Sequence, residues 1–245
     1  MSKKLLVLGG TKEARELIDR LALCDNVETT ASLAGATKAP LPLAVTARSG
    51  GFGGVVGLKK YLQEHQITTL IDATHPFATQ ITANARHACE ASDVEYLRLT
   101  RPPWQPSNAD TWYQFADLSQ AIAALPAGAR VFSAIGSKEA ARLSSRPDVF
   151  WVVRALDAEL EAKVSDTCQV IIEKPRTRVE DEIHLLRSLR VDAVLAKNSG
   201  GSAGYNKIAA ARHLSLPLYL VDQPKNTAPT ERVFHSLDQL LEMIR

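Results

Sequence analysis

The sequence predicts an α/β protein built from two Rossmann-like αβα domains, each with a parallel sheet, and a cleft between them. Short apolar runs alternate with amphipathic helical patterns along the chain, which is typical of parallel sheets covered by helices on both faces. Three segments of the first half recur in the second half at a near-constant spacing of roughly 120 residues, which indicates an internal duplication. The pairs are residues 8–14 and 135–140, 85–102 and 211–224, and 118–125 and 237–244.

The length of 245 residues suits one large domain or two small ones. We place the domains at residues 1–112 and 113–245, divided within the Pro/Trp/Ser-rich stretch 102–112, and the helix that closes each half could pack on either domain. A composition of 45% hydrophobic and 23% charged residues is that of an ordinary globular protein. The net charge of +2 favours neither nucleic acid nor a membrane as partner, and we expect a monomer or a small homo-oligomer.

The three cysteines, Cys24, Cys89 and Cys168, are scattered along the chain. Their spacing fits neither a metal site nor a disulfide framework, which favours a reducing compartment. The apolar run after the first four residues is too short for the core of a signal peptide, and no stretch reaches membrane-spanning length. We therefore expect a cytoplasmic protein without a metal.

The first strand and helix surround a glycine turn. Residues 5–8 form an unbroken apolar run, and an apolar stripe with helical spacing follows over residues 14–21. Thr11 can cap that helix, while Gly9 and Gly10 allow a ligand to approach backbone N–H groups at its positive end. The turn therefore predicts a phosphate site. The alternative is a tight strand-to-helix turn that binds nothing.

The second predicted strand, residues 27–32, ends without a carboxylate. In dinucleotide sites an acidic residue at this position selects the free 2′-hydroxyl of NAD. Here Ser32 is followed by Thr37 and Lys38, which favours a 2′-phosphate and hence NADP. A simple polar loop is the alternative.

A glycine-rich loop covers residues 50–54, where four glycines surround one phenylalanine. Such a run is costly inside a strand or helix because glycine loses so much conformational freedom there. Gly51 and Gly53 are therefore expected where backbone comes close to a ligand or to another strand.

The strand at residues 69–73 leads into Thr74, His75 and Pro76. Pro76 suits the first turn of the helix that follows. His75 thus stands beyond the carboxyl end of a strand, where open α/β sheets bind their ligands, so we take it as a candidate functional residue. A purely structural histidine is the alternative.

Arg98 and Arg101 lie beside Trp104 on a proline-stiffened segment. Two guanidinium groups in this setting can hold carboxylates by forked hydrogen bonds. The alternative is a domain-linking segment with a packed tryptophan.

In the second half, the strand at residues 191–196 delivers a loop of glycines, hydroxyls and lysines. Its residues are Lys197, Asn198, Ser199, Gly200 and Gly201, with Tyr205 and Lys207 close behind. This composition at a strand's carboxyl end favours an anion or cofactor site facing the first domain across the cleft, and a flexible loop is the alternative. A basic cluster that contains Arg176 precedes the neighbouring helix.

Taken together, the motifs resemble the precorrin-6A reductase and cobalt-precorrin-6A reductase family of adenosylcobalamin biosynthesis. The resemblance runs in order over nearly the whole chain, and its most specific parts are the Asp-Ala-Thr-His-Pro-Phe-Ala and Gly-Gly-Phe-Gly-Gly segments. The motifs occupy residues 9–14, 32–35, 50–54, 72–78, 98–104 and 197–201. Two departures are the alanine at position 36, where many members carry arginine and where Lys38 is the nearest substitute, and the Lys-Pro-Arg-Thr at 174–177.

The resemblance implies an NADPH-dependent reduction, with NADH possible, of one double bond of a tetrapyrrole-derived ring, from precorrin-6A to precorrin-6B. Hydride goes to one carbon and a proton to its neighbour. His75 and Tyr205 are candidate proton donors by position only, and solvent or the substrate itself could serve instead. The motifs add Glu13, Gly35 and Thr74 to the cofactor-binding residues. The acetate and propionate groups of the ring require cationic partners at loop ends, for which we name Arg48, Arg98, Arg101, Arg176 and Lys207.

Two other functions fit the same pattern. A two-domain binding protein could close on an anionic ligand without chemistry. An S-adenosylmethionine methyltransferase also carries a glycine turn after its first strand. The missing acidic residue at the end of the second strand counts against the methyltransferase, because that residue normally holds the ribose.

Overall fold

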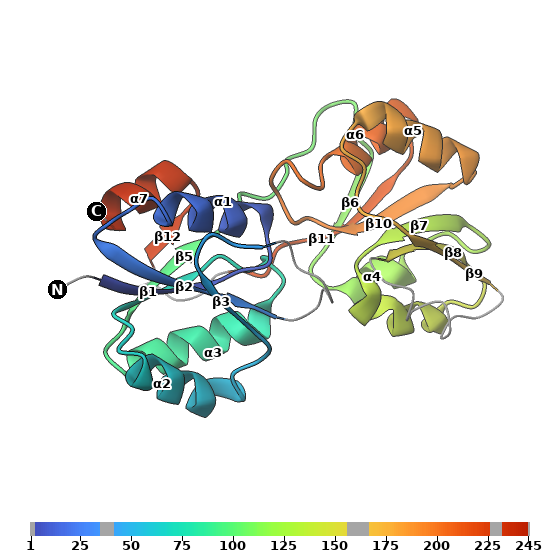
Figure 1. The fold of residues 1–245 in the computed structure, drawn as a ribbon. Coiled ribbons are helices and arrows are strands. Elements are labelled where there is room, and N and C mark those ends of the chain that lie inside the picture. Colours follow the sequence, from blue (N-terminus) through green and yellow to red (C-terminus); the bar gives the residue numbers. More distant parts are fainter. Residues whose placement is uncertain (1–2, 35–41, 156–166, 226–231, 245) are drawn as a thin grey trace. The chain divides into compact units, whose positions relative to one another are not determined.

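The computed structural model describes residues 3–34, 42–155, 167–225 and 232–244. The chain forms two compact units, shown in Figure 1. Unit 1 contains Met1–Arg101 and Lys225–Arg245, and unit 2 contains Pro102–Pro224. The chain therefore passes from one unit to the other twice.

Unit 1 is built on a six-stranded sheet in which every neighbouring pair is parallel. The strand order is β12-β5-β4-β1-β2-β3. This is the Rossmann order, and its direction of winding reverses between β1 and β4. The strands are β1 (Lys3–Leu8), β2 (Val27–Leu33), β3 (Thr46–Ser49), β4 (Thr69–Asp72), β5 (Glu95–Leu99) and β12 (Arg232–Phe234).

Helices cover both faces of this sheet, with α1 and α7 on one side and α2 and α3 on the other (Figure 1). The apolar stripe predicted for residues 14–21 is buried, and Leu17 and Leu21 pack with Leu240 and Ile244 in one core cluster. Each such side chain contributes about 1.5–3 kcal/mol by leaving water. The helices are α1 (Lys12–Leu21), α2 (Gly54–Glu64), α3 (Thr79–Glu90) and α7 (Leu237–Ile244).

Unit 2 repeats the topology. Its sheet is also parallel throughout, in the order β6-β11-β10-β7-β8-β9. In Figure 1, α5 and α6 lie on one face and α4 on the other. The elements are β6 (Trp112–Phe115), α4 (Leu118–Ala123), β7 (Arg130–Ala134), the 3₁₀ helix η1 (Ser137–Ser145), β8 (Phe150–Ala155), β9 (Cys168–Ile172), α5 (Val179–Ser188), β10 (Ala193–Lys197), α6 (Asn206–His213) and β11 (Leu218–Val221).

The two units exchange their sixth strand and its helix. β6 and α4 follow the strands of unit 1 in sequence but complete the sheet of unit 2, while β12 and α7 follow unit 2 and complete unit 1. The observed grouping therefore differs from the predicted division into 1–112 and 113–245. In the structure β12 pairs with β5, and α7 buries its apolar stripe against α1. The apolar stripe of a helix shows which face is buried but does not identify the unit on which it packs.

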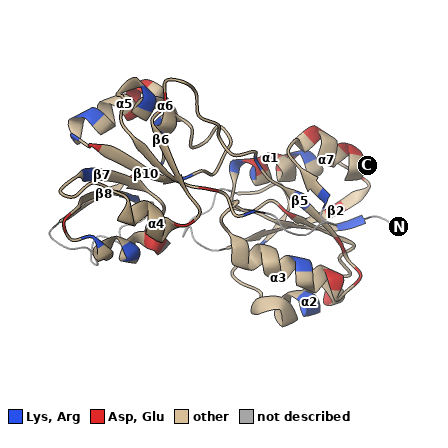
Figure 2. Ribbon diagram, turned by 180° about the vertical axis from the view of Figure 1, so that it is seen from behind, with Lys and Arg blue, Asp and Glu red and all other residues tan. Residues whose placement is uncertain are grey.

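Acidic and basic residues are interspersed along the helices of both units (Figure 2). None of the helices within the described residues is long and apolar enough to cross a membrane. The expectation of two Rossmann-like αβα units with parallel sheets is confirmed.

Candidate functional site

The glycine turn lies at the switch point of unit 1, between the carboxyl ends of β1 and β4. Gly10 has a φ of +115°, a conformation that residues with a side chain rarely adopt. The Thr11 hydroxyl accepts a hydrogen bond from the N–H of Ala14 at 3.0 Å, so Thr11 caps α1 as predicted. The same hydroxyl donates to the Ala73 carbonyl at 2.9 Å, which ties the turn to the end of β4.

This turn fits a phosphate group. The first backbone amides of a helix have no acceptor within the helix, and they carry the positive end of its dipole. Apart from the two chain neighbours of Gly10, no heavy atom of the described residues lies within 4 Å of the place where its Cβ would stand. Glu13, in the first turn of α1, pairs with Arg101 at 2.9 Å. Glu13 was predicted to bind the cofactor and Arg101 to bind the substrate, yet these two side chains form an ion pair with each other.

Arg48 lies next to Ser32 at the ends of β3 and β2. Its guanidinium donates to Ser32 Oγ at 2.7 Å and to the carbonyls of Gly50 and Gly51 at 2.9 and 3.0 Å. It also lies over the ring of Phe52, 3.9 Å from the ring centroid. Arg48 therefore organises the glycine-rich loop and stands at the ribose end of a Rossmann site. Gly35, Thr37 and Lys38, which we also assigned to the cofactor, lie outside the described residues.

The glycine-rich loop needs its glycines for backbone geometry. Gly50, Gly53 and Gly54 have φ values of +101°, +79° and +82°. Gly57, one turn into α2, is required for a different reason, because a Cβ there would lie 1.7 Å from the Phe52 carbonyl oxygen. Sequence reasoning missed Gly57, although a glycine inside a helix is the usual signal of close packing.

Asp72, the last residue of β4, is fully buried and holds the centre of a polar cluster. It is paired with Arg98 at 2.5 Å and accepts further hydrogen bonds from Thr74, Thr82 and Tyr96. Arg98 is only 6% exposed, so its guanidinium belongs to the interior of unit 1. We expected Arg98 to bind carboxylates of the substrate. In the structure its guanidinium pairs instead with the buried carboxylate of Asp72. No local signal reveals this, because Leu97, Arg98 and Leu99 are all buried in a strand that is covered on both faces.

His75 lies on the exposed turn that follows Thr74. Its Nδ1 accepts the backbone N–H of Phe77 at 3.3 Å, and its ring lies 5.8 Å from the Phe77 ring. Because Nδ1 is the acceptor, the neutral imidazole carries its proton on Nε2.

The loop at residues 197–201 is held from within unit 2. The Asn198 amide exchanges two hydrogen bonds with the Trp104 backbone, at 2.8 and 3.0 Å, and the Trp104 indole donates to the Gly201 carbonyl at 2.7 Å. Lys197 pairs with Glu139 at 3.0 Å. Burial acts to raise the pKa of Glu139, but the hydrogen bond and charge of Lys197 outweigh it and lower that pKa. Gly200 and Gly201 have positive φ, as a tight loop requires.

The remaining predicted residues of unit 2 also have partners inside the unit. The Tyr205 hydroxyl accepts a hydrogen bond from Arg212 at 3.0 Å, and Lys207 donates to the Gly204 carbonyl at 2.8 Å. Arg176 donates to Glu173 and to the Asp181 carbonyl. The prediction that residues 197–201 face unit 1 across a cleft stays a prediction.

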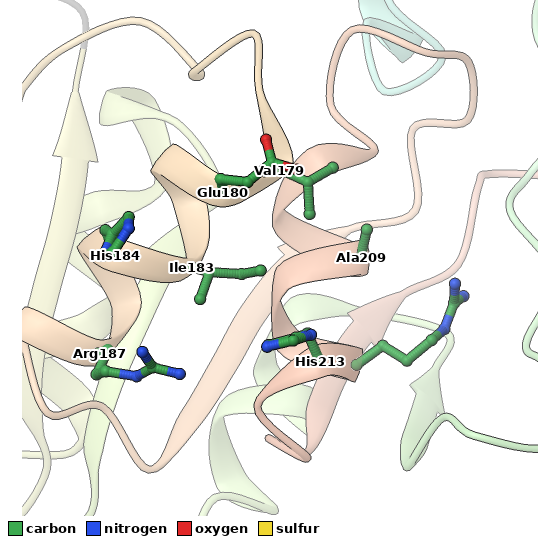
Figure 3. A pocket seen from close by; sticks show the side chains of 8 residues that line it. Val179, Glu180, Ile183, His184, Arg187, Ala209 and His213 are labelled. Atoms are coloured by element: carbon green, nitrogen blue, oxygen red, sulfur yellow. The ribbon is translucent and has the colours of Figure 1, made fainter.

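A groove of about 560 Å³ runs between α5 and α6. Arg187 and His213 point into it from opposite sides, above an apolar floor that includes Ile183 and Ala209 (Figure 3). Both basic side chains belong to the last turns of their helices, where cations complement the negative end of the helix dipole. That end lies at the edge of the fold opposite the strand carboxyl ends. The groove is therefore not the expected ligand site.

The described residues hold no group of three or more His, Cys, Asp or Glu side chains suited to a metal ion. The features that do converge are a parallel sheet in Rossmann order, a capped helix at its switch point and a glycine turn between them. They define a Rossmann-like α/β protein with two related units.

Comparison with known proteins names the family. The family model described as "Precorrin-6x reductase CbiJ/CobK" matches residues 4–245, and the chain belongs to this family. It is 41% identical to a precorrin-6A reductase of Sinorhizobium sp. (91% of this chain, 85% of the relative) and 43% identical to that of Rhodobacter capsulatus (90% and 88%). A solved structure named CobK precorrin-6A reductase superposes with a TM-score of 0.90 at 37% identity, covering 99% of this chain and 96% of the other.

Proposed function

We propose that this protein reduces one double bond of precorrin-6A to give precorrin-6B, with a nicotinamide cofactor as the hydride donor. The observation that carries the proposal is the glycine turn at the switch point of unit 1, in a chain that matches a reductase family over residues 4–245. A hydride and a proton add to the two carbons of the bond, so the cofactor is oxidised as the ring is reduced. The composition and the three free thiols suit a reducing cytoplasm.

Unit 1 binds the cofactor in this proposal. Gly9, Gly10 and the first amides of α1 hold the pyrophosphate, and Thr11 keeps the turn attached to β4 through the Ala73 carbonyl. A side chain at Gly9 would meet Leu33 at 3.3 Å, so this position favours glycine as well. When bound, the nicotinamide supplies hydride, and the protein contributes binding, orientation and exclusion of water. The assignment of residues 197–201 to the cofactor stays a prediction from the sequence.

NADPH is the preferred cofactor in this proposal. The carboxylate that binds the free 2′-hydroxyl of NAD is replaced at the end of β2 by Ser32. Arg48 stands beside Ser32, and its partly exposed guanidinium is the group that suits a 2′-phosphate. In this proposal Arg48, which we predicted to bind substrate, is assigned to the cofactor instead. Lys38 and Thr37 keep their predicted role here.

His75 is the proposed proton donor. It lies on the exposed turn after β4, at the same switch point as the glycine turn, and the imidazolium form of a histidine is a general acid. Tyr205, the second candidate, packs against Trp104 and accepts a hydrogen bond from Arg212 within unit 2. The Tyr205 hydroxyl is engaged inside unit 2, whereas His75 is exposed at the switch point of the unit that carries the glycine turn. We therefore assign the proton to His75.

The test is an anaerobic assay of the purified protein with precorrin-6A and NADPH. The expected result is stoichiometric loss of NADPH absorbance together with formation of precorrin-6B, identified by mass spectrometry as the addition of two hydrogens. NADH should support a lower kcat/KM. Binding of both ligands without cofactor oxidation would contradict the proposal and favour the binding protein without chemistry.

A further inference from the structure

The carboxylate of Asp72 receives five hydrogen bonds from four places in unit 1. Its Oδ1 accepts from the Thr74 backbone N–H at 3.0 Å and from the Thr74 hydroxyl at 2.6 Å. Its Oδ2 accepts from Thr82 Oγ1 at 2.7 Å, the Tyr96 hydroxyl at 3.0 Å and Arg98 Nη1 at 2.5 Å. Arg98 Nη1 also donates to Thr82 Oγ1 at 2.7 Å, which closes the network.

Such a cluster is poorly explained by stability alone. Removing two charges from water costs so much that a buried ion pair often stabilises a fold no better than apolar residues of similar volume. Buried polar networks are instead associated with the definition of one local conformation, and each member must be satisfied. Both oxygens of Asp72 are satisfied. The question is therefore which conformation this network defines.

The bonds to Asp72 point to the turn after β4. Two of the five come from Thr74, the residue before His75. Ala73, which lies between Asp72 and Thr74, is held through both of its backbone groups. Its N–H donates to the Leu8 carbonyl at 3.0 Å, and its carbonyl accepts a hydrogen bond from the Thr11 hydroxyl. The turn closes when the Ala78 N–H donates to the His75 carbonyl at 2.8 Å. Asp72 thus fixes the backbone that leads directly to His75.

We propose that Asp72 is a positioning residue, whose buried carboxylate, neutralised by Arg98, holds the turn of residues 73–78 so that His75 is presented in a single orientation. Neither side chain touches the reacting atoms; both act through Thr74. The inference rests on the proposed role of His75. Beyond that role, the inference assigns to the Asp72–Arg98 pair the task of keeping His75 in the orientation from which it delivers the proton.

Unit 2 supplies a matched control. Arg154 and Glu182 form a second buried ion pair, with Arg154 Nη1 2.6 Å from Glu182 Oε1 and Glu182 only 1% exposed. This pair also receives a backbone N–H, from Arg176 at 3.0 Å, but Glu182 Oε2 has no hydrogen-bond partner among the residues that the structure describes. Breaking it removes a buried charge pair of the same type without touching residues 73–78.

The experiment compares Asp72→Asn with Glu182→Gln by ¹⁵N-detected NMR of the histidine rings in the full chain. In the wild type, the His75 Nδ1 signal should be that of an accepting nitrogen in one tautomer. Asp72→Asn should move it toward the average of interconverting rotamers and tautomers, while Glu182→Gln leaves it unchanged. Thr74→Val keeps the Asp72–Arg98 pair intact and should shift the same signal, which covers the case in which Asp72→Asn fails to fold.

Turnover supplies the second readout. A misplaced proton donor should lower kcat by about tenfold or more in Asp72→Asn and Thr74→Val. We expect KM for NADPH to change by less than about twofold in Asp72→Asn, since the glycine turn keeps its own bonds. Unchanged His75 signals in both variants, or an equal loss of kcat in Glu182→Gln, would overturn the proposal. A wild-type protein that does not turn over precorrin-6A would contradict the proposed function instead, while the NMR comparison still decides the positioning role.

Discussion

Units 1 and 2 share one topology but differ at the carboxyl edge of the sheet. In unit 1, β1 runs through two glycines into an α-helix that Thr11 caps. In unit 2, β7 runs through the single Gly136 into the 3₁₀ helix η1, and the glycine N-cap offers no side-chain oxygen. Lys197, at the end of β10, is paired with Glu139 of η1. The same topology thus carries a capped glycine turn in one unit and an ion pair in the other.

The comparison shows that the topology sets where a ligand site can lie, while the local residues decide whether a ligand binds there. Both units offer a switch point, between β1 and β4 and between β7 and β10. Only the first combines an open glycine backbone with an α-helix N-terminus, which is what attracts phosphate. The following predictions test this difference between the units.

The largest expected effect is on cofactor binding. Gly10→Val forces a β-branched residue to a φ of +115° and turns the amides of α1 away from phosphate, so NADPH affinity should fall by about a hundredfold or more. Gly136→Val meets a similar φ of +90° in unit 2 and should leave the affinity within about twofold. Fluorescence titration measures both, with circular dichroism as the check on folding. Equal losses in the two variants would show that unit 2 holds phosphate too.

The second effect separates the candidate proton donors. His75→Ala should lower kcat by about a hundredfold with little change in NADPH affinity, because a positioned general acid contributes at least that factor. Tyr205→Phe removes the phenolic hydroxyl from unit 2 and should change kcat by less than about twofold. Steady-state kinetics with precorrin-6A decide between them. A larger loss in Tyr205→Phe would transfer the role to unit 2.

The third effect concerns cofactor preference. Arg48→Ala removes a hydrogen-bond donor for the 2′-phosphate, and bonds to charged groups contribute about 1.5–3 kcal/mol, so NADPH affinity should fall by at least about tenfold. NADH affinity should stay nearly constant. Arg176→Ala, on the loop after β9 in unit 2, serves as the control. If the ratio of the two affinities does not move in Arg48→Ala, Arg48 serves only to shape the glycine-rich loop.

The smallest effect is a difference in acid stability. Burial acts to raise the pKa of Asp110, but the hydrogen bonds from Arg212 and Ser107 and the charge of Arg212 outweigh it and lower that pKa to about 2. The ionised pair therefore stabilises unit 2 above the unfolded pKa, and this stability is lost as the pH falls from about 4 to about 2.

All three tryptophans, Trp104, Trp112 and Trp151, lie in unit 2, so their fluorescence during urea unfolding follows that unit. At neutral pH, Asp110→Asn should lower the urea concentration at the midpoint of unfolding of unit 2. The variant should also no longer show the loss of stability between pH 4 and pH 2. An unchanged acid profile in the variant would mean that other carboxylates govern this window.

Much of the candidate site follows from local sequence pattern. The turn at Gly10, the cap at Thr11 and the exposed position of His75 are all found where the strand and helix periodicities predict them. These features depend on residues within one or two turns of each other, and their backbone geometry is set locally. The same holds for the resemblance to the reductase family, which the family match confirms.

Arg98 and Arg48 mark where local pattern is insufficient. Both were predicted to meet substrate because they stand at strand ends, yet one is buried on Asp72 and the other lies beside Ser32. Their partners are 26 and 16 residues away in the sequence. A strand end indicates that a side chain is near the site, while only packing decides what it contacts.

The sequence by itself determined the class of the fold, the inward face of each helix and the position of the glycine turn, because hydrophobic period and backbone φ are local properties. The tertiary structure alone decided that β6 and β12 exchange units and that Asp72 collects five hydrogen bonds. The apolar stripe of a helix can be buried against any sheet of complementary shape. A buried carboxylate can likewise accept hydrogen bonds from any donors that reach it. Which sheet and which donors they are depends on segments that meet only when the whole chain has folded.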